Sequence, residues 1–392
     1  MDDIDDTYAI FRIKGGDATK SWEASPEGPP EIEYQQNTLS RRAAAELRED
    51  PEFLVAQSMP LTLIEPYDYA ARNERQPETP HGDTAWGIQA IGADASGLDG
   101  KGAVVAVLDT GIDCSHPAFA GVDLKTYRNF TSENDEDSNG HGTHCAGTIF
   151  GRDVDGQRIG VAKGVERAVI AKVLGKGGGR TGDLAEAVLW SVEEGANIVS
   201  MSLGIDFPAV VKHLVNGKMD PAAASSRALK SYRENVDLFN SLATYLKMAD
   251  SVGKGAIILA ASGNASRRPK YEIDVEPPAA SSEIISVGAL QPGPAGLEVA
   301  SFSNTGCAIS APGVGVLSAK TKTKTLVTKS GTSMATPHVA GVAALHAEQE
   351  LAQTGKITRL NLQARLLGTA TRDGLNPASR SVEVGAGRVV AP

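Results

Sequence analysis

From Trp86 onward, short apolar runs alternate with helical stretches. The candidate strands lie at 103–108, 168–174, 197–202, 256–260 and 284–289, and the candidate helices lie near 141–150, 183–194, 226–251 and 334–350. Each strand is a continuous run of apolar residues, as expected of a strand that is buried on both faces. This alternation predicts an α/β fold in which helices cover both faces of a doubly wound parallel sheet. A ligand site in such a sheet lies beyond the carboxyl ends of the strands.

The first 66 residues follow a different pattern. Tyr8–Lys14 is strand-like, residues 15–36 are rich in Gly, Pro, Ser and Glu and read as a loop, and Leu39–Asp50 reads as a helix with Ser40 as its cap. Phe53–Ile64 supplies further apolar strand material. We therefore expect a small α+β domain over residues 1–66. Residues 67–84 are polar and aperiodic with two prolines, which predicts a cleavable linker before a large domain at 85–392.

Composition narrows the class of protein. The chain has 392 residues, 41% of them hydrophobic, and its net charge of −10 without an extended basic face argues against a nucleic-acid partner. Three cysteines imply no complete disulfide framework, and no apolar run reaches the length of a membrane span. The acidic start, Met1-Asp2-Asp3-Ile4, lacks the features of a signal peptide. We expect a cytoplasmic protein, with extracellular release by another route left open.

Three segments carry an acid, an imidazole and a hydroxyl. Asp109 ends the apolar run Val104–Leu108, His141 lies in the first turn of a small-residue helix, and Ser333 lies where Gly331-Thr332-Ser333-Met334 opens another. A hydroxyl at a helix N-terminus lies beside outward-pointing backbone N–H groups that stabilise a developing oxyanion. Together the three groups are the parts of a nucleophilic triad in the order Asp, His, Ser.

With these motifs the chain resembles the subtilases, the subtilisin-like serine proteases of peptidase family S8, over roughly residues 85 to 392. The resemblance implies a subtilisin-type sheet in which Asp109 orients the imidazole, His141 acts as general base and then acid, and Ser333 attacks the substrate. It also makes Asn264 of Ala260-Ala261-Ser262-Gly263-Asn264 an oxyanion donor beside the Ser333 N–H. Without Ser333, the same Gly-Asn pair would be read as an ordinary turn.

The resemblance places a substrate backbone between two extended segments. These are Gly177-Gly178-Gly179 and Ser202-Leu203-Gly204, where glycine permits the close approach of an added strand. Aligned with the family, Glu276 falls at the floor of the S1 pocket, followed by a Pro277–Pro278 bond that matches a family cis-proline. A carboxylate there favours Arg or Lys at P1. The alternative is a slipped alignment that leaves Glu276 simply exposed.

The N-terminal domain resembles a degenerate subtilase propeptide, which would act as an intramolecular chaperone and inhibitor; an unrelated extension is the alternative. Arg72 and Arg75 in the linker suit self-processing by an enzyme with basic P1 specificity. Residues 205–225 look like an insertion beside a substrate-binding strand, either a lid, a partner surface or a passive loop.

These observations predict a self-processing serine endopeptidase acting on proteins or peptides, with no nucleic-acid or membrane partner. The alternatives are a restrained subtilase that serves as a partner-binding scaffold, or a protease dedicated to one precursor peptide. We expect no required cofactor and assign no metal ligands. Calcium is possible through Asp153 and Asp155, although Ala118 stands where many relatives have an aspartate ligand.

Overall fold

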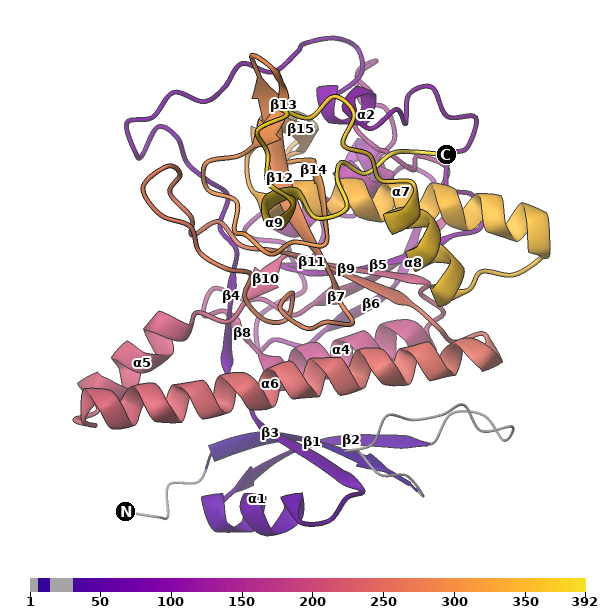
Figure 1. Ribbon diagram of the computed structural model, residues 1–392. Coiled ribbons are helices and arrows are strands. Elements are labelled where there is room, and N and C mark those ends of the chain that lie inside the picture. The colour runs from indigo at the N-terminus through magenta and orange to yellow at the C-terminus, as the bar shows by residue number, and fades with distance from the viewer. Residues whose placement is uncertain (1–5, 15–30) are drawn as a thin grey trace.

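The computed structural model describes residues 6–14 and 31–392, so the acidic start and most of the predicted first loop lie outside the described residues. Its centre is an eight-stranded sheet in the order β13-β12-β11-β9-β5-β7-β6, with β14 pairing with β12 (Figure 1). All pairs are parallel except β12 with β13, so the predicted parallel sheet is confirmed. The strands are β5 (Val104–Asp109), β6 (Asp123–Asn129), β7 (Arg167–Lys172), β9 (Ile198–Met201), β11 (Ile257–Ala261), β12 (Ile285–Gly293), β13 (Gly296–Val299) and β14 (Ile309–Pro312).

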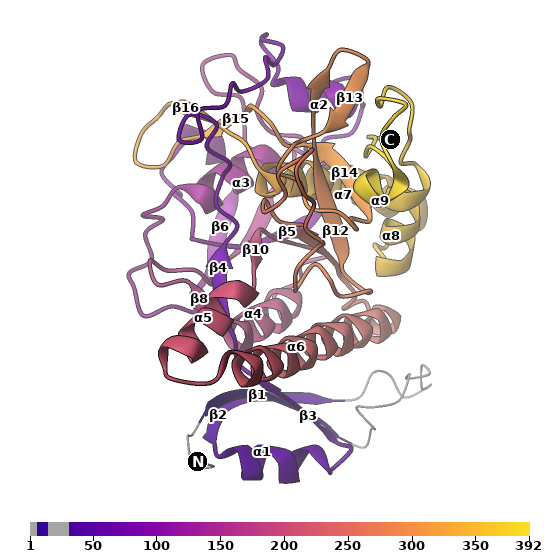
Figure 2. The ribbon, with the colours of Figure 1, turned by 60° about the vertical axis from the view of Figure 1, so that its left-hand side comes forward.

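Helices cover both faces of this sheet. On one face, α3 (His141–Phe150) and α7 (Thr332–Thr354) pack against Val105 and Val107 of β5. On the other, α4 (Thr181–Glu193) and α6 (Pro221–Ala249) pack against Ala106 and Leu108 (Figure 2). Successive residues of one strand thus enter two different cores, which explains why the strands are apolar without alternation. Smaller elements surround them: α2 (Trp86–Ala90), β15 (Val316–Ala319), β16 (Leu326–Lys329), α8 (Arg359–Gly368) and α9 (Ser381–Val384).

The N-terminal unit is an antiparallel sheet in the order β2-β1-β3, formed by β1 (Asp6–Ile13), β2 (Ile32–Leu39) and β3 (Phe53–Gln57). Alternate residues of β1 face opposite sides: Tyr8 and Ile10 pack under α1 (Arg41–Arg48), while Ala9 and Phe11 pack against α4 and α6. The Ser40 hydroxyl accepts a hydrogen bond from Ala43 N at 3.2 Å, which confirms the predicted cap.

The predicted loop through residue 36 is wrong for its last residues. Ile32–Leu39 is a strand that pairs along its whole length with β1. Most residues of this strand are polar, so the sequence gives little sign of a buried strand. The strand pairs with β1 through its backbone, and only alternate side chains are partly buried.

The predicted strand 53–64 divides at Ser58. After β3 the chain leaves the N-terminal sheet and enters β4 (Pro60–Leu63), which lies between β8 (Gly179–Arg180) and β10 (Leu203–Gly204) in a separate antiparallel sheet. The N-terminal unit is thereby joined to the edge of the large domain through its own chain (Figure 1).

The segment 205–225 is not a loop. It contains α5 (Phe207–Asn216), whose N-cap Asp206 accepts a hydrogen bond from Ala209 N at 2.9 Å, and the start of α6. Within the described residues, no helix is both long and apolar enough to span a membrane.

Candidate active site

The predicted acid and imidazole meet at the carboxyl edge of the sheet. Asp109 ends β5, and His141 begins α3; His141 Nδ1 lies 2.8 and 3.0 Å from the two Asp109 carboxylate oxygens, and both side chains are buried. Burial disfavours the imidazolium, but the adjacent Asp109 carboxylate outweighs it, and the pKa of His141 is raised above its ordinary value. This contact fixes the ring with Nε2 directed away from Asp109, as a general base requires.

A residue that the sequence analysis missed holds this pair in place. Asp137, itself buried, accepts hydrogen bonds from Gly140 N (2.7 Å) and Thr143 N (2.9 Å), which are donors at the start of α3. Its carboxylate also accepts from the hydroxyls of Thr110 and Thr143. Asp137 therefore caps the helix that carries His141 and ties it to the loop after Asp109. The available signal was an acid three residues before the N-cap position, Gly140.

Ser333 and Asn264 meet at the start of α7. Thr332 donates to Asn264 Oδ1 from both its N–H and its hydroxyl, each at 2.9 Å, so the Asn264 amide is held with Nδ2 facing the cleft. Ser333 is buried and lies in the first turn of the helix. The structure therefore places the Asn264 amide beside the first turn of α7, next to the residue that precedes Ser333.

The chain's own residues 60–65, termed the occupant, fill the cleft between β8 and β10. Leu63 and Thr62 pair with Leu203 and Gly204, and Leu61 pairs with Gly179. Ile64 N donates to Ser202 O at 3.4 Å, and the Leu61 side chain is buried. The segment thus lies where a substrate strand was expected, with Ile64 at the P1 position and Leu61 at P4.

The two segments that were expected to flank a substrate, 177–179 and 202–204, contact the occupant in different ways. Gly178 has φ +83°, and a Cβ there would lie 2.2 Å from the Leu61 carbonyl oxygen, so the occupant's backbone requires glycine at this position. Gly179 pairs with the occupant, whereas a Cβ on Gly177 would contact nothing. Ser202, Leu203 and Gly204 all pair with the occupant as expected.

The occupant's carbonyl groups are not placed for cleavage. The Ser333 hydroxyl donates to Ile64 O at 3.0 Å, whereas Asn264 Nδ2 donates to the next carbonyl, Glu65 O, at 2.8 Å. His141 Nε2 is buried and has no hydrogen-bond partner in the described part of the chain. The nucleophile is therefore engaged by one carbonyl and the oxyanion donor by another, and the serine–histidine hydrogen bond is not made.

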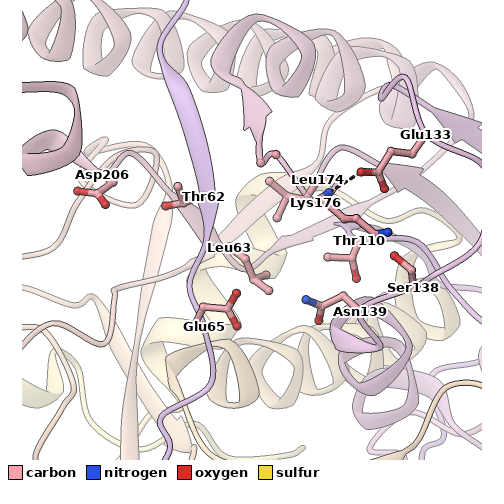
Figure 3. Close-up of a pocket in the computed structure, with 13 residues that line it drawn as sticks. Thr62, Leu63, Glu65, Thr110, Glu133, Ser138, Asn139, Leu174, Lys176 and Asp206 are labelled. Carbon is pink, nitrogen blue, oxygen red and sulfur yellow. Dashed lines mark hydrogen bonds between the residues drawn. The ribbon is translucent and has the colours of Figure 1, made fainter. Parts of the chain in front are cut away.

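Beside the occupant, a cavity of about 500 Å³ opens along the cleft (Figure 3). Thr62, Leu63 and Glu65 of the occupant line it on one side. The lining from the large domain includes Thr110 next to Asp109, Asn139 before α3, and the Gly175–Gly178 turn, whose Lys176 N donates to Glu133 at 2.7 Å. This space adjoins the P2 and P3 positions of a bound strand.

The Glu276 side chain lies against Gly204 of β10 and against Gly263, which directly precedes Asn264. A Cβ built on Gly204 would lie 2.8 Å from its Oε1, and one on Gly263 would lie 3.0 Å away. Burial, and secondarily the Asp206 carboxylate, raise the pKa of Glu276 to about 7. The Pro277–Pro278 bond is cis, as expected.

Arg72 and Arg75 are not at the nucleophile. Both are exposed in the stretch 70–76, where Arg72 lies over the Tyr67 ring and Arg75 pairs with Glu78. The start of the predicted linker is firmly packed: Tyr67 and Tyr69 are buried, and Tyr67 stacks on Phe302 with ring centroids 4.6 Å apart. Continuous exposure, which proteolysis requires, begins after Tyr69, in the stretches 70–76 and 80–83.

The structure offers little to a metal ion. Of the calcium candidates, Asp153 pairs with Lys163 at 3.2 Å, and Asp155 is a turn residue with φ +50°. Among the described residues, one group of three potential ligand atoms is close enough to share an ion, namely Asp109, His141 and Cys145. Burial raises the pKa of the Cys145 thiol, which therefore stays protonated at neutral pH.

Comparison with known proteins identifies the same region. Residues 100–387 match the sequence model of the Subtilase family. The chain is 34% identical over 285 residues to a "Cuticle-degrading serine protease" of Arthrobotrys oligospora, covering 67% of this chain and 58% of that one. It is 31% identical to a "Thermophilic serine proteinase" of Bacillus sp., covering 70% of this chain and 57% of that one. It is 34% identical to the "Major intracellular serine protease" of Bacillus subtilis, covering 66% of this chain and 73% of that one. The chain thus spans less than three fifths of the length of the first two relatives.

Proposed function

The chain belongs to the subtilase family, and from this premise we propose that it is a serine endopeptidase made as a self-inhibited zymogen. The observation that carries the proposal is the peptide strand in the cleft: it meets Ser333, Asn264 and Ser202 through its backbone, beside an Asp109–His141 pair. A site that holds a polypeptide by strand addition, next to a nucleophile and a base, suits peptide-bond hydrolysis.

The proposed reaction begins once residues 60–65 leave the cleft. Ser333 Oγ attacks the P1 carbonyl carbon while its proton passes to His141 Nε2, and Asp109 stabilises the resulting imidazolium. Asn264 Nδ2 and the Ser333 N–H donate to the oxyanion. The C–N bond then breaks as His141 returns the proton to the leaving amine, and water, activated by the same imidazole, hydrolyses the acyl-enzyme.

The N-terminal unit acts in this proposal as the inhibitor. It is held to the large domain by apolar packing on α4 and α6 and by ion pairs of Arg227 with Asp6 (2.8 Å) and Arg48 with Glu234 (3.0 Å). These contacts hold β4 and the residues after it in the cleft, where Ser333 and Asn264 contact two different carbonyl groups. Residues 1–66 thus serve as the propeptide-like domain, 67–84 as the linker and 85–392 as the peptidase.

We assign basic P1 specificity to Glu276, because its carboxylate lies between the walls of the S1 site. The occupant presents Ile64 there, which suits an inhibitor that is bound without being a good substrate. Cleavage after Arg72 or Arg75 is assigned to a second enzyme molecule, since both bonds are exposed and eight or more residues beyond Ile64. We assign no step of this reaction to calcium, and we propose an intracellular location from two relatives named as intracellular serine proteases.

The test follows the chain by mass spectrometry. Wild-type protein should be cleaved after Arg72 or Arg75 at a rate that rises with concentration, whereas Ser333→Ala stays intact alone and is cut when processed wild type is added. Processing of isolated Ser333→Ala at the wild-type rate would contradict the proposal. So would wild-type protein that, freed of its N-terminal unit, hydrolyses neither casein nor a peptide library.

A further inference from the structure

A half-buried lysine stands beside the segment that follows Ile64. Lys329 ends β16, and its Nζ donates to Gly140 O at 3.2 Å. Gly140 directly precedes His141, so the ammonium is fixed next to the catalytic base. Among the described residues, Lys329 Nζ forms no ion pair with a carboxylate, and its hydrogen-bond acceptor is the backbone oxygen of Gly140.

The cavity that Lys329 lines is also lined by acids of the stretch 65–74. Lys329 shares a cavity of about 510 Å³ with Glu65, Asp68 and Glu74. The Glu74 carboxylate is engaged by the Tyr67 hydroxyl at 2.7 Å, whereas Glu65 is exposed. The occupant thus brings negative charge to this half of the cleft.

Backbone contacts indicate which substrate position lies near the cavity that Lys329 lines. The Ser333 hydroxyl donates to Ile64 O, and Tyr67 N donates to Ser330 O at 2.6 Å. Glu65 and Pro66, the residues between these two anchors, line the same cavity as Lys329. A substrate strand with its P1 residue at Ile64 would therefore bring its P1′ residue to this cavity.

Beyond Ser333 the charged side chains of the large domain near the occupant include two cations, Lys329 and Arg267, with Arg267 over the Tyr67 ring at 5.3 Å. The side of P1 and P3 is mixed in charge, with Glu276, Asp206 and Lys176. Cations placed beside one half of a cleft select the register and orientation of a bound strand more than they raise its affinity.

We infer that Lys329 is a specificity-determining residue that selects an acidic side chain at P1′. This inference rests on the proposed peptidase function and refines its substrate class to sequences with Asp or Glu directly after the cleaved bond. In the inhibited protein Glu65 holds the P1′ position and lines the same cavity as Lys329 without forming an ion pair with it.

The experiment uses processed enzyme and fluorogenic peptides with one fixed non-primed half, taken from the sequence cleaved fastest in a library. The P1′ residue is Glu, Gln or Lys. For the wild type we expect kcat/KM to be about tenfold higher for Glu than for Lys, with Gln between, and the ratio to fall as salt is raised. Lys329→Glu should reverse the order, and Lys329→Arg should keep it.

Lys324→Glu is the matched control, because it makes the same charge change at an exposed turn residue. A purely structural role for Lys329, through Gly140 O, would lower all three rates together and leave their order unchanged, which would overturn the inference. An unchanged order in Lys329→Glu with full activity would do the same. If processed wild type cleaves no peptide at all, the peptidase function fails and this refinement with it.

Discussion

At the scale of single residues, the site depends on two carboxylates in different environments. Asp109 lies against His141 at 2.8 Å and accepts Thr110 N at 2.7 Å. Glu276 has no cation beside it within the described residues, and burial raises its pKa to about 7. Two acids in one cleft thus have different surroundings: Asp109 is paired with His141, whereas Glu276 gains its full charge only when pH rises or a cation binds.

The discrimination for basic P1 residues should therefore depend on pH. Glu276 is neutral below its pKa and charged above it, so the ratio of kcat/KM for Arg to that for Leu at P1 should rise between about pH 6 and 8. Titration of His141 changes kcat/KM for both substrates, so its effect cancels in the ratio. Glu276→Gln should give a low and pH-independent ratio, and Asp274→Asn, at an exposed neighbour, should behave as wild type. A wild-type ratio that is flat over this range would contradict the S1 assignment.

Sequence alone predicted Asp109, His141, Ser333 and Asn264, because local backbone places each of them at a strand end or helix start. It did not find Asp137 or Lys329. Asp137 had a local signal as a cap of α3, but its contact with Thr110 joins a segment 27 residues away. Lys329 contacts Gly140, which is 189 residues away. Roles that depend on contacts between distant segments have little local signal.

At the scale of elements, α3 is the part whose position matters most, since it carries His141. Its N-cap Gly140 has no side chain, and φ +82° there favours glycine. The capping carboxylate comes instead from Asp137, three residues earlier. The start of the helix therefore depends on one buried acid.

Asp137→Ala should weaken both stability and catalysis. Leaving the donors at the start of α3 without an acceptor should lower the free energy of unfolding by about 2 kcal/mol. A displaced His141 should lower kcat/KM about tenfold or more. Denaturant unfolding and peptide hydrolysis measure the two effects. The control is Glu136→Ala at the exposed neighbouring position; equal effects of the two substitutions would show that Asp137 has no special role.

Element prediction failed where polar residues or distant pairing decided the structure. The helix α5 had recognisable signals, an Asp206 cap and Pro208 in the first turn, but lay in a segment read as an insertion. Strand β4 could not be assigned a partner from sequence, because Gly179 and Leu203 lie more than 100 residues away from it. The apolar side chains at Leu61 and Leu63 fit a strand in either sheet.

At the scale of the whole molecule, the N-terminal unit and β4 act together. The sheet β2-β1-β3 packs on α4 and α6, and its chain continues directly into the cleft (Figure 2). The Thr181 N–H and hydroxyl both bond to Met59, whose carbonyl accepts at 2.9 Å and whose N–H donates at 2.9 Å. Removing the unit therefore frees the cleft and the start of α4 together.

Leu61 is the side chain that should hold the segment in the cleft most strongly. Burying a leucine contributes about 1.5–3 kcal/mol, so Leu61→Asn should raise peptide hydrolysis by the unprocessed chain about 10- to 100-fold. Thr62→Asn is the control, since that side chain is exposed on the same strand. Initial rates measured before any processing should separate the two variants. Equal rates would mean that the buried side chain does not contribute to inhibition.

The central claim is that Ser333 is a working nucleophile which the chain's own residues 60–65 cover. A fluorophosphonate probe, with the modified residue located by peptide mapping, tests it directly. The full chain should label slowly, and the same chain cut by trypsin in the exposed stretch 70–76 and separated from its N-terminal unit should label rapidly at Ser333. Ser333→Ala should not label in either form. Labelling of the intact chain as fast as that of the cut chain would contradict the account, as would a cut and separated chain that does not label at Ser333.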